Sequence, residues 1–118
     1  MGHPIAFFEV VSPDHDRAQS SYRELFDWQI APNLATGGYG LVDTGAGEHA
    51  IGGGIGPSTQ PSDTGAKVYV KVDDLDAHLD RAKALGGKRL AAATELPGDF
   101  GRPAIFTDPD RNQVGLWA

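Results

Sequence analysis

The chain contains no cysteine, and this absence removes several kinds of chemistry at once. Disulfide bridges, thiolate metal ligands and cysteine nucleophiles are all excluded. No run of about 18 apolar residues is present, which argues against a membrane-spanning helix. The first residues have neither the basic flank nor the apolar stretch of a signal peptide, so we expect a cytoplasmic protein.

Basic residues are scarce, with 10 lysines and arginines against 16 acids and a formal net charge of −6. Nucleic acids and anionic membranes bind basic surfaces, so neither is expected as a partner. The charge is uneven: residues 1–60 hold seven acids and two bases (−5), and residues 61–118 hold nine acids and eight bases (−1). The acidic balance of the whole chain suits cationic ligands.

The 118 residues fall into two halves with the same pattern. Each half has one strand, one helix opened by Asp14 or Asp74, and three short strands. The expected strands are 5–11, 28–30, 39–42 and 50–53, then 67–72, 89–91, 103–106 and 113–117. Apolar residues at helical spacing are Ala18, Tyr22, Leu25 and Phe26, then Leu75, Leu79, Ala82 and Leu85.

An internal offset relates the halves, because Asp14-His15-Asp16 matches Asp74-Leu75-Asp76 at a shift of 60. Ile51-Gly52 matches Val114-Gly115 at a shift of 63. We therefore expect one α+β domain of two tandem βαβββ modules. Module 1 covers about 3–56, a linker about 57–65, and module 2 about 66–118.

Three segments carry a resemblance to a known family. They read DHDRA…YRELFDW at 14–28, VKVDDLD…LGGK at 70–88, and FTDPDRN…GLW at 106–117. With this order and spacing the chain resembles the vicinal oxygen chelate superfamily, which includes glyoxalases, bleomycin-resistance proteins and extradiol dioxygenases. The resemblance implies a cupped, barrel-like mixed sheet with the helices outside.

In the metalloenzymes of that superfamily, four strands each supply one ligand to a divalent ion. The resemblance maps these ligands to Phe7, Gly52, Lys67 and Gly115. Phenylalanine and glycine offer no side-chain ligand, and a protonated lysine is a poor one. We therefore expect no metal and no cofactor. The turn also departs from the family pattern, since Arg111 stands where glycine is usual.

Side-chain alternation along the strands indicates which residues line the inner face. The candidate ligand-binding residues are Phe7, Glu9, Tyr39, Gly52, Lys67, Tyr69, Arg102, Gly115 and Trp117. Leu41 and Ala104 are expected beside them. The opposite face, under the helices, is expected to hold Phe8, Val10, Val68, Val70, Val72, Val114 and Leu116. Aromatic walls with a few charges are typical of a small-molecule pocket.

Glu9 and Lys67 have two interpretations, a partly buried ion pair or polar anchors for a ligand.

Three functional classes are compatible with the sequence. A ligand-binding or sequestering protein needs only the pocket; a metal-free enzyme would use Glu9, Lys67 or Tyr69 for proton transfer. The alternative is a divalent-metal glyoxalase, lyase or dioxygenase, against which the ligand positions argue. A small-molecule ligand and a homodimer are the expected partners, the dimer because sheet edges stay exposed and many relatives pair.

Two further patterns lead to expectations about phosphate and metal binding. The glycines of residues 52–56 are not followed by a helix, so a phosphate loop is disfavoured, and we expect them to bend the sheet and leave cavity space. The four histidines, His3, His15, His49 and His78, are too scattered along the chain for a shared metal site to be expected.

Overall fold

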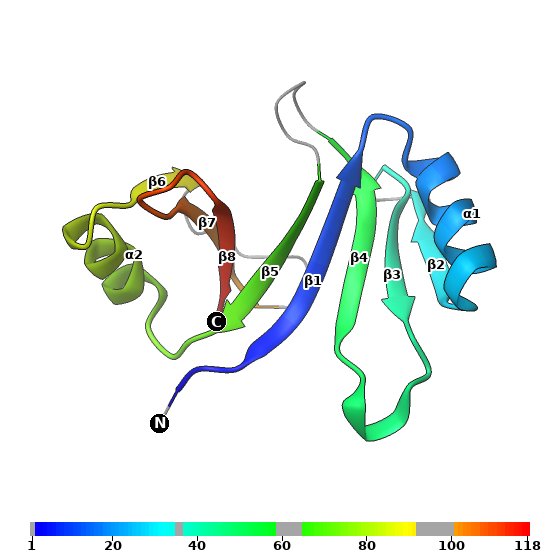
Figure 1. Ribbon diagram of the computed structural model, residues 1–118, viewed down its shortest axis with the longest axis horizontal. Helices are drawn as coiled ribbons and strands as arrows, with labels where there is room; N and C mark the ends of the chain where they lie inside the picture. The colour runs from blue at the N-terminus through cyan, green and yellow to red at the C-terminus, as the bar shows by residue number, and fades with distance from the viewer. Residues whose placement is uncertain (1, 35–36, 59–64, 92–100) are drawn as a thin grey trace. The chain divides into compact units, whose positions relative to one another are not determined.

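The computed structural model describes residues 2–34, 37–58, 65–91 and 101–118 (Figure 1). The chain forms two compact units, one of residues 7–66 and one of residues 67–118 together with 2–6. Among the described helices, none is long and apolar enough to cross a membrane.

The unit of residues 7–66 has a four-stranded sheet and one helix. Its elements are β1 (Ile5–Ser12), α1 (His15–Phe26), β2 (Gln29–Asn33), β3 (Tyr39–Asp43), a 3₁₀ helix (Gly47–His49) and β4 (Gly52–Pro57). The strands lie in the order β2-β3-β4-β1. β1 runs parallel to β4, and the other neighbours are antiparallel.

The unit of residues 67–118 repeats this topology. Its elements are β5 (Gly65–Lys71), α2 (Leu75–Ala84), β6 (Lys88–Ala91), β7 (Pro103–Thr107) and β8 (Gln113–Trp117). The strands lie in the order β5-β8-β7-β6, with β5 parallel to β8. The α+β class and the two tandem βαβββ modules are therefore confirmed.

Residues 2–6, which include the first two residues of β1, pack with the second unit. The backbone N–H of Lys71 donates to the carbonyl of Pro4 at 2.9 Å. The rings of His3 and His78 meet edge to face, with centroids 4.9 Å apart. These contacts join the beginning of the chain to β5 and α2.

Both helices begin at the predicted aspartates. The Asp14 carboxylate accepts from the N–H of Arg17 at 3.1 Å, and that of Asp74 from the N–H of Ala77 at 3.0 Å. A carboxylate at this position satisfies a free N–H and complements the positive end of the helix dipole. The apolar stripe of α2 stops earlier than expected, because Leu85 is the residue that caps the helix and is 68% exposed.

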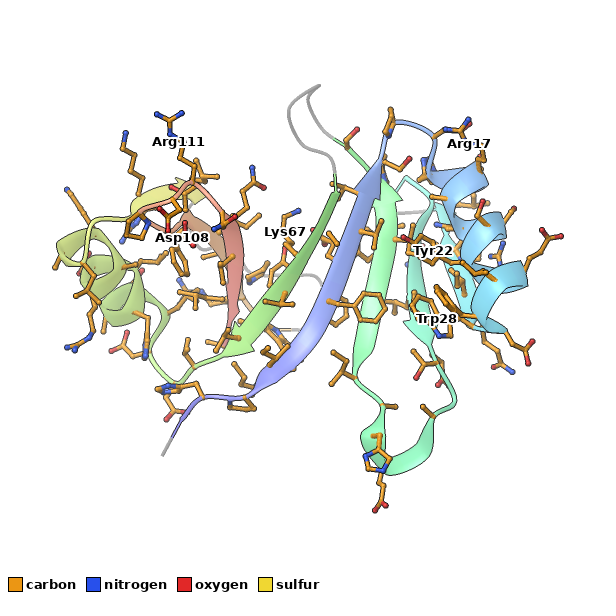
Figure 2. The ribbon with its side chains drawn as sticks, in the orientation of Figure 1. Arg17, Tyr22, Trp28, Lys67, Asp108 and Arg111 are labelled. Atoms are coloured by element: carbon orange, nitrogen blue, oxygen red, sulfur yellow. The ribbon has the colours of Figure 1, made fainter. Side chains whose placement is uncertain are left out.

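The core of the first unit lies between its sheet and α1. Ile30, Val42 and Ile55 are buried there. Packed against them are Phe8, Val10, Ala18, Tyr22 and Trp28. The Tyr22 and Trp28 rings stack nearly parallel, with centroids 5.6 Å apart (Figure 2). Phe8 and Val10 thus lie on the helix side of β1, as predicted.

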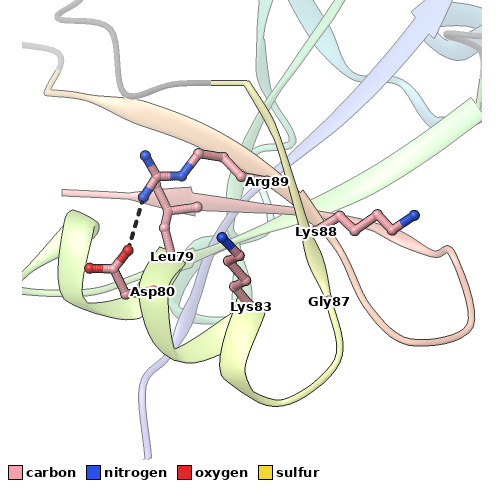
Figure 3. Close-up of a pocket in the computed structure, with 6 residues that line it drawn as sticks. All are labelled: Leu79, Asp80, Lys83, Gly87, Lys88 and Arg89. Atoms are coloured by element: carbon pink, nitrogen blue, oxygen red, sulfur yellow. Dashed lines mark hydrogen bonds and ion pairs between the residues drawn. The ribbon is translucent and has the colours of Figure 1, made fainter.

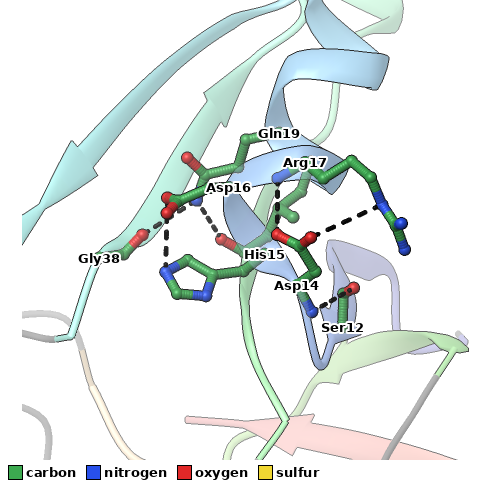
Figure 4. A network of polar contacts seen from close by, with 8 residues as sticks. Ser12, Asp14, His15, Asp16, Arg17, Gln19 and Gly38 are labelled. Atoms are coloured by element: carbon green, nitrogen blue, oxygen red, sulfur yellow. Dashed lines mark hydrogen bonds and ion pairs between the residues drawn. The ribbon is translucent and has the colours of Figure 1, made fainter.

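Gln19 is a core residue that the spacing of apolar residues does not predict. It is 2% exposed, and its side-chain amide donates to the carbonyls of Gly38 at 2.9 Å and Ile55 at 2.8 Å (Figure 4). These bonds satisfy backbone groups of β4 and of the turn before β3. They fix the first turns of α1 to the sheet.

The core of the second unit lies between its sheet and α2. Its buried residues are Val72, Leu75, Leu79, Ala104 and Leu116, with Val70, Phe106 and Ala118 packed against them. Val70, Val72 and Leu116 lie under the helix as predicted, whereas Val68 is 38% exposed and lies outside this cluster. We call the sheet face opposite α1 or α2 the helix-free face of that unit.

The turn between β7 and β8 is organised by one carboxylate. Asp108 accepts from the backbone N–H groups of Asp110 and Asn112 and from the Asn112 side-chain amide. The hydrogen bonds from Asn112, its side chain first, lower the pKa of Asp108. Arg111 adopts a left-handed conformation, with φ of 71°. The family's glycine is therefore replaced at a position where a side chain is strained.

Replacing Arg111 with glycine should stabilise the protein by about 1 kcal/mol, because glycine adopts positive φ without steric cost. Urea denaturation of Arg111→Gly against the parent chain measures the difference. Asp27→Gly is the matched control, since Asp27 is the other described non-glycine residue with positive φ, at 58°. Aspartate tolerates this conformation better than arginine, so the control should gain less. An unchanged or lowered stability of Arg111→Gly contradicts the assignment of strain.

Candidate functional site

The helix-free faces carry eight of the nine residues predicted from the sequence. In the first unit these are Phe7 and Glu9 on β1, Tyr39 on β3 and Gly52 on β4. In the second unit they are Lys67 and Tyr69 on β5, with Gly115 and Trp117 on β8. Each set alternates with residues of its unit's core, which fixes the face on which it lies.

Arg102 is the exception, and its predicted position was wrong together with that of Ala104. Ala104 pairs with Leu116 and is buried under α2, so it lies on the helix side of the sheet. Arg102 exchanges backbone hydrogen bonds with Ala118, which packs against the same core. Because residues paired in this way lie on the same face of a sheet, Arg102 lies on the face that α2 covers. Pro103 and Ile105, which pair with Trp117 and Gly115, occupy the helix-free face instead.

In the first unit, a tyrosine ring lies on the backbone of the neighbouring strand. A Cβ added to Gly54 or Gly56 would collide with the ring of Tyr39. The Tyr39 hydroxyl donates to a carboxylate oxygen of Glu9 at 2.7 Å. Glu9 lies opposite Gly54 in the sheet, so the phenol crosses β4 to reach β1. Because the ring occupies this space, the expectation that these glycines leave a cavity was wrong.

Phe7 and Gly52 occupy paired positions on β1 and β4. The nearest atom to a Cβ added at Gly52 would be Cδ2 of Phe7, at 4.0 Å. This is ordinary van der Waals contact, and Gly52 is exposed. The first unit thus presents a phenyl ring, an open backbone position and the Glu9–Tyr39 pair.

The second unit repeats the contact between a tyrosine and a glycine. The ring of Tyr69 lies on Gly115, where an added Cβ would collide with it. Lys67 extends from the same strand (Figure 2), and both Lys67 and Tyr69 are 7% exposed. The Lys71 ammonium lies over the Trp117 ring, 4.5 Å from its centroid, which is a cation–π geometry.

The four positions that correspond to metal ligands do not fit a metal ion. Phe7, Gly52 and Gly115 supply no donor atom, and Lys67 supplies a cation. At Gly115 the ring of Tyr69 also occupies the space that a ligating side chain would need. Within the described ranges, no three histidine, aspartate or glutamate residues are grouped so as to hold a metal ion.

Two surface pockets lie away from the predicted residues. One, of about 460 Å³, lies between α2 and β6 and is lined by Leu79, Asp80, Lys83, Gly87, Lys88 and Arg89 (Figure 3). Its Arg89 pairs with Asp80 at 3.3 Å. The other, of about 320 Å³, follows β2 and β3 and is lined by Gln29, Ile30, Ala31, Leu41, Val42 and Asp43. Both are open grooves, whereas the helix-free face of each unit carries aromatic side chains beside charged ones.

Comparison with known proteins gives the family. Residues 7–116 match the family model described as Glyoxalase-like domain. Over 113 residues the chain is 30% identical to a protein of Mycobacterium bovis named "Putative glyoxylase CFP32". That alignment covers 92% of this chain and 43% of the relative, so the chain spans about two-fifths of the relative's length.

Solved structures share the fold at low sequence identity. Methylmalonyl-CoA epimerase from Mycobacterium tuberculosis is 15% identical, with a TM-score of 0.65 over 96% of this chain and 85% of its own. A glyoxalase/bleomycin resistance protein/dioxygenase superfamily member from Vibrio splendidus is 12% identical, with a TM-score of 0.62 over 98% and 97%. These likenesses agree with the βαβββ modules described above.

The two glycines at metal-ligand positions should respond differently to a methyl group. Gly115→Ala forces a Cβ into the Tyr69 ring and should destabilise the protein by about 1–3 kcal/mol. Gly52→Ala, the matched control, meets only Phe7 at 4.0 Å and should change stability by less than about 1 kcal/mol. Denaturation of both variants, with Gly115→Ala repeated in a Tyr69→Ala background, checks this. Equal effects at the two glycines would show that the ring does not fill the position.

Proposed function

Because the chain belongs to the family of glyoxalase-like domains, within the vicinal oxygen chelate superfamily, we propose that it binds a small organic molecule without a metal ion. The binding surfaces are the helix-free faces of its two units. The chemistry of the four metal-ligand positions carries the proposal, since none of them offers a suitable donor. The remaining groups on these faces bind by hydrogen bonding, charge and aromatic contact.

The aromatic content of these faces supports small-molecule binding. Phe7 and Tyr39 in the first unit, and Tyr69 and Trp117 in the second, provide apolar surface beside a few polar groups. Pockets for small molecules combine apolar walls with a small number of polar groups that orient the ligand. The Glu9–Tyr39 pair is such a group in the first unit.

Metal-free proton transfer is a second candidate function, and the same pair favours it. The Tyr39 hydroxyl lies 2.7 Å from the Glu9 carboxylate, within the distance required for direct proton transfer. In such an enzyme, Glu9 would accept a proton from the substrate and Tyr39 would stabilise the carboxylate or relay the proton. Lys67 and Tyr69 are the corresponding candidates of the second unit.

Purified, tag-free protein should contain much less than one equivalent of Zn, Ni, Fe, Mn or Co, because the ligand positions lack donors. Elemental analysis after dialysis against a chelator and then against metal-free buffer measures this content. Thermal melting with and without added divalent ions provides a second readout, and the melting temperature should not change. One tightly held equivalent of any of these metals would overturn the metal-free assignment and favour a metal-dependent lyase or dioxygenase.

Fragment hits on the first unit should depend on Glu9 and Tyr39. In a fragment screen by NMR, ligands that shift the β1, β3 and β4 amides should bind about tenfold more weakly to Glu9→Gln. Tyr39→Phe should act similarly while keeping the ring over Gly54. The control is Glu24→Gln, an exposed carboxylate on α1, which should bind as the parent does. Unchanged affinity in both test variants would remove this pair from the ligand site.

A further inference from the structure

The groove between α2 and β6 has a cationic lining in a chain that is acidic overall. Its charged residues are Lys83, Lys88 and Arg89 against the acid Asp80, whereas the whole chain has a net charge of −6. Its volume of about 460 Å³ lies in the range of small-molecule sites. All of its lining residues belong to the second unit. Because local charge decides which ligand a surface attracts, this groove favours anions.

A carboxylate of the chain already lies against the guanidinium in this groove. Nη2 of Arg89 is 3.3 Å from Oδ1 of Asp80 (Figure 3). The two side chains are 43% and 79% exposed, and ion pairs this accessible to water contribute little to stability. A guanidinium has five N–H donors, of which this contact occupies one. Asp80 therefore marks a position where an oxyanion reaches Arg89, and it is held weakly enough to be displaced.

Lys83 lies beside the same position. It follows Asp80 by three residues on α2, and side chains at this spacing are neighbours on a helix surface. Figure 3 shows the Lys83 side chain extending from the helix into the groove on the side of Arg89, whereas the ammonium of Lys88 points away. Within the described ranges, Lys83 takes part in no ion pair. The Lys83 ammonium and the Arg89 guanidinium therefore flank the place that the Asp80 carboxylate occupies.

The presence of Asp80 selects the kind of anion. A free carboxylate carries the same charge as the Asp80 side chain and has to displace a group that is tethered beside Arg89. A phosphate monoester carries a charge of about −1.5 to −2 at pH 7 and has three acceptor oxygens, which can reach two cations at once. Arginine also binds phosphate through two parallel hydrogen bonds. A phosphate group therefore gains more from this groove than a carboxylate does.

We propose that the groove between α2 and β6 binds a small organic phosphate, with the phosphate group held by Arg89 and Lys83. Asp80 keeps the guanidinium in the groove until phosphate takes its place. The organic part of the ligand lies along the methylene chains of Lys83 and Lys88. This site is separate from the helix-free faces, so it is a second binding function beyond the proposed one.

Four probes titrated into ¹⁵N-labelled protein at pH 7 and low salt test the ligand class. They are phenyl phosphate, inorganic phosphate, benzoate and benzylamine. Phenyl phosphate should shift the amides of residues 79–89 and bind about fivefold more tightly than benzoate. Inorganic phosphate should shift the same amides at higher concentration, because it lacks the organic part, and benzylamine should not shift them. Benzoate or inorganic phosphate binding as tightly as phenyl phosphate, or shifts caused by benzylamine, would overturn the assignment.

Variants of the cations test whether the named residues hold the phosphate. Lys83→Met and Arg89→Met should each weaken phenyl phosphate binding about fivefold, because each removes one charged donor. The matched control is Arg81→Met, which removes an exposed cation of α2 that does not line the groove and should leave the affinity unchanged. Lys83 is exposed, so its variant stays informative if Arg89→Met disturbs β6. Equal losses in Arg81→Met and Lys83→Met would show attraction to general positive charge and contradict the site.

Removal of the competing carboxylate should have the opposite effect. Asp80→Asn should tighten the binding of phenyl phosphate and of benzoate about two- to fivefold, because Arg89 no longer has to leave a charged partner. Weaker binding of phenyl phosphate to Asp80→Asn would overturn the role given to Asp80 and with it the choice of phosphate.

The readouts keep this inference apart from the proposed function. The groove is followed through amides of α2 and β6, whereas the fragment screen follows amides of β1, β3 and β4. If phenyl phosphate leaves residues 79–89 unshifted, the groove assignment falls and the proposed function stands. If fragments leave the helix-free faces unshifted while phenyl phosphate binds the groove, the proposed function falls and this site stands.

Discussion

A tyrosine ring lying on the glycines of a neighbouring strand is the contact on which both helix-free faces depend. Tyr39 covers Gly54 and Gly56, and Tyr69 covers Gly115. Without a Cβ the backbone admits the ring at van der Waals distance, so the glycines are packing positions rather than empty space. In the first unit this contact also brings the Tyr39 hydroxyl to Glu9, two strands away.

The same contact supports the proposal that this chain binds its ligand without a metal ion. A ligating side chain at Gly115 and the ring of Tyr69 would compete for one volume. With Phe7 and Lys67 at two further positions, aromatic and cationic groups stand where a chelating set would be expected. What remains is a surface suited to apolar contact, hydrogen bonding and charge attraction.

One topology occurs twice in the chain, in two units with similar packing and different charge on their strands. Both place a helix on one sheet face and begin that helix at a capping aspartate. The strands differ, because those of the first unit carry only acids and those of the second only bases. Packing depends on apolar residues at alternate strand positions, so the charged residues of the helix-free faces can diverge while the fold is kept.

The sequence by itself determined the two βαβββ modules and both helix starts, because periodicity and caps are local signals. It also determined that Phe8, Val10 and Val70 lie on the face of the sheet that packs against a helix. Tertiary structure alone decided that Gln19 is buried and that tyrosines fill the glycine positions, since both need partners from other elements. It also decided the face of Arg102 and Ala104. The offset of 63 that relates Gly52 to Gly115 becomes 62 between Leu41 of β3 and Pro103 of β7, which pair with the corresponding residues Gly54 and Trp117. One residue of slip moves every side chain of a strand to its other face, and only the observed pairing of β7 with β8 reveals it.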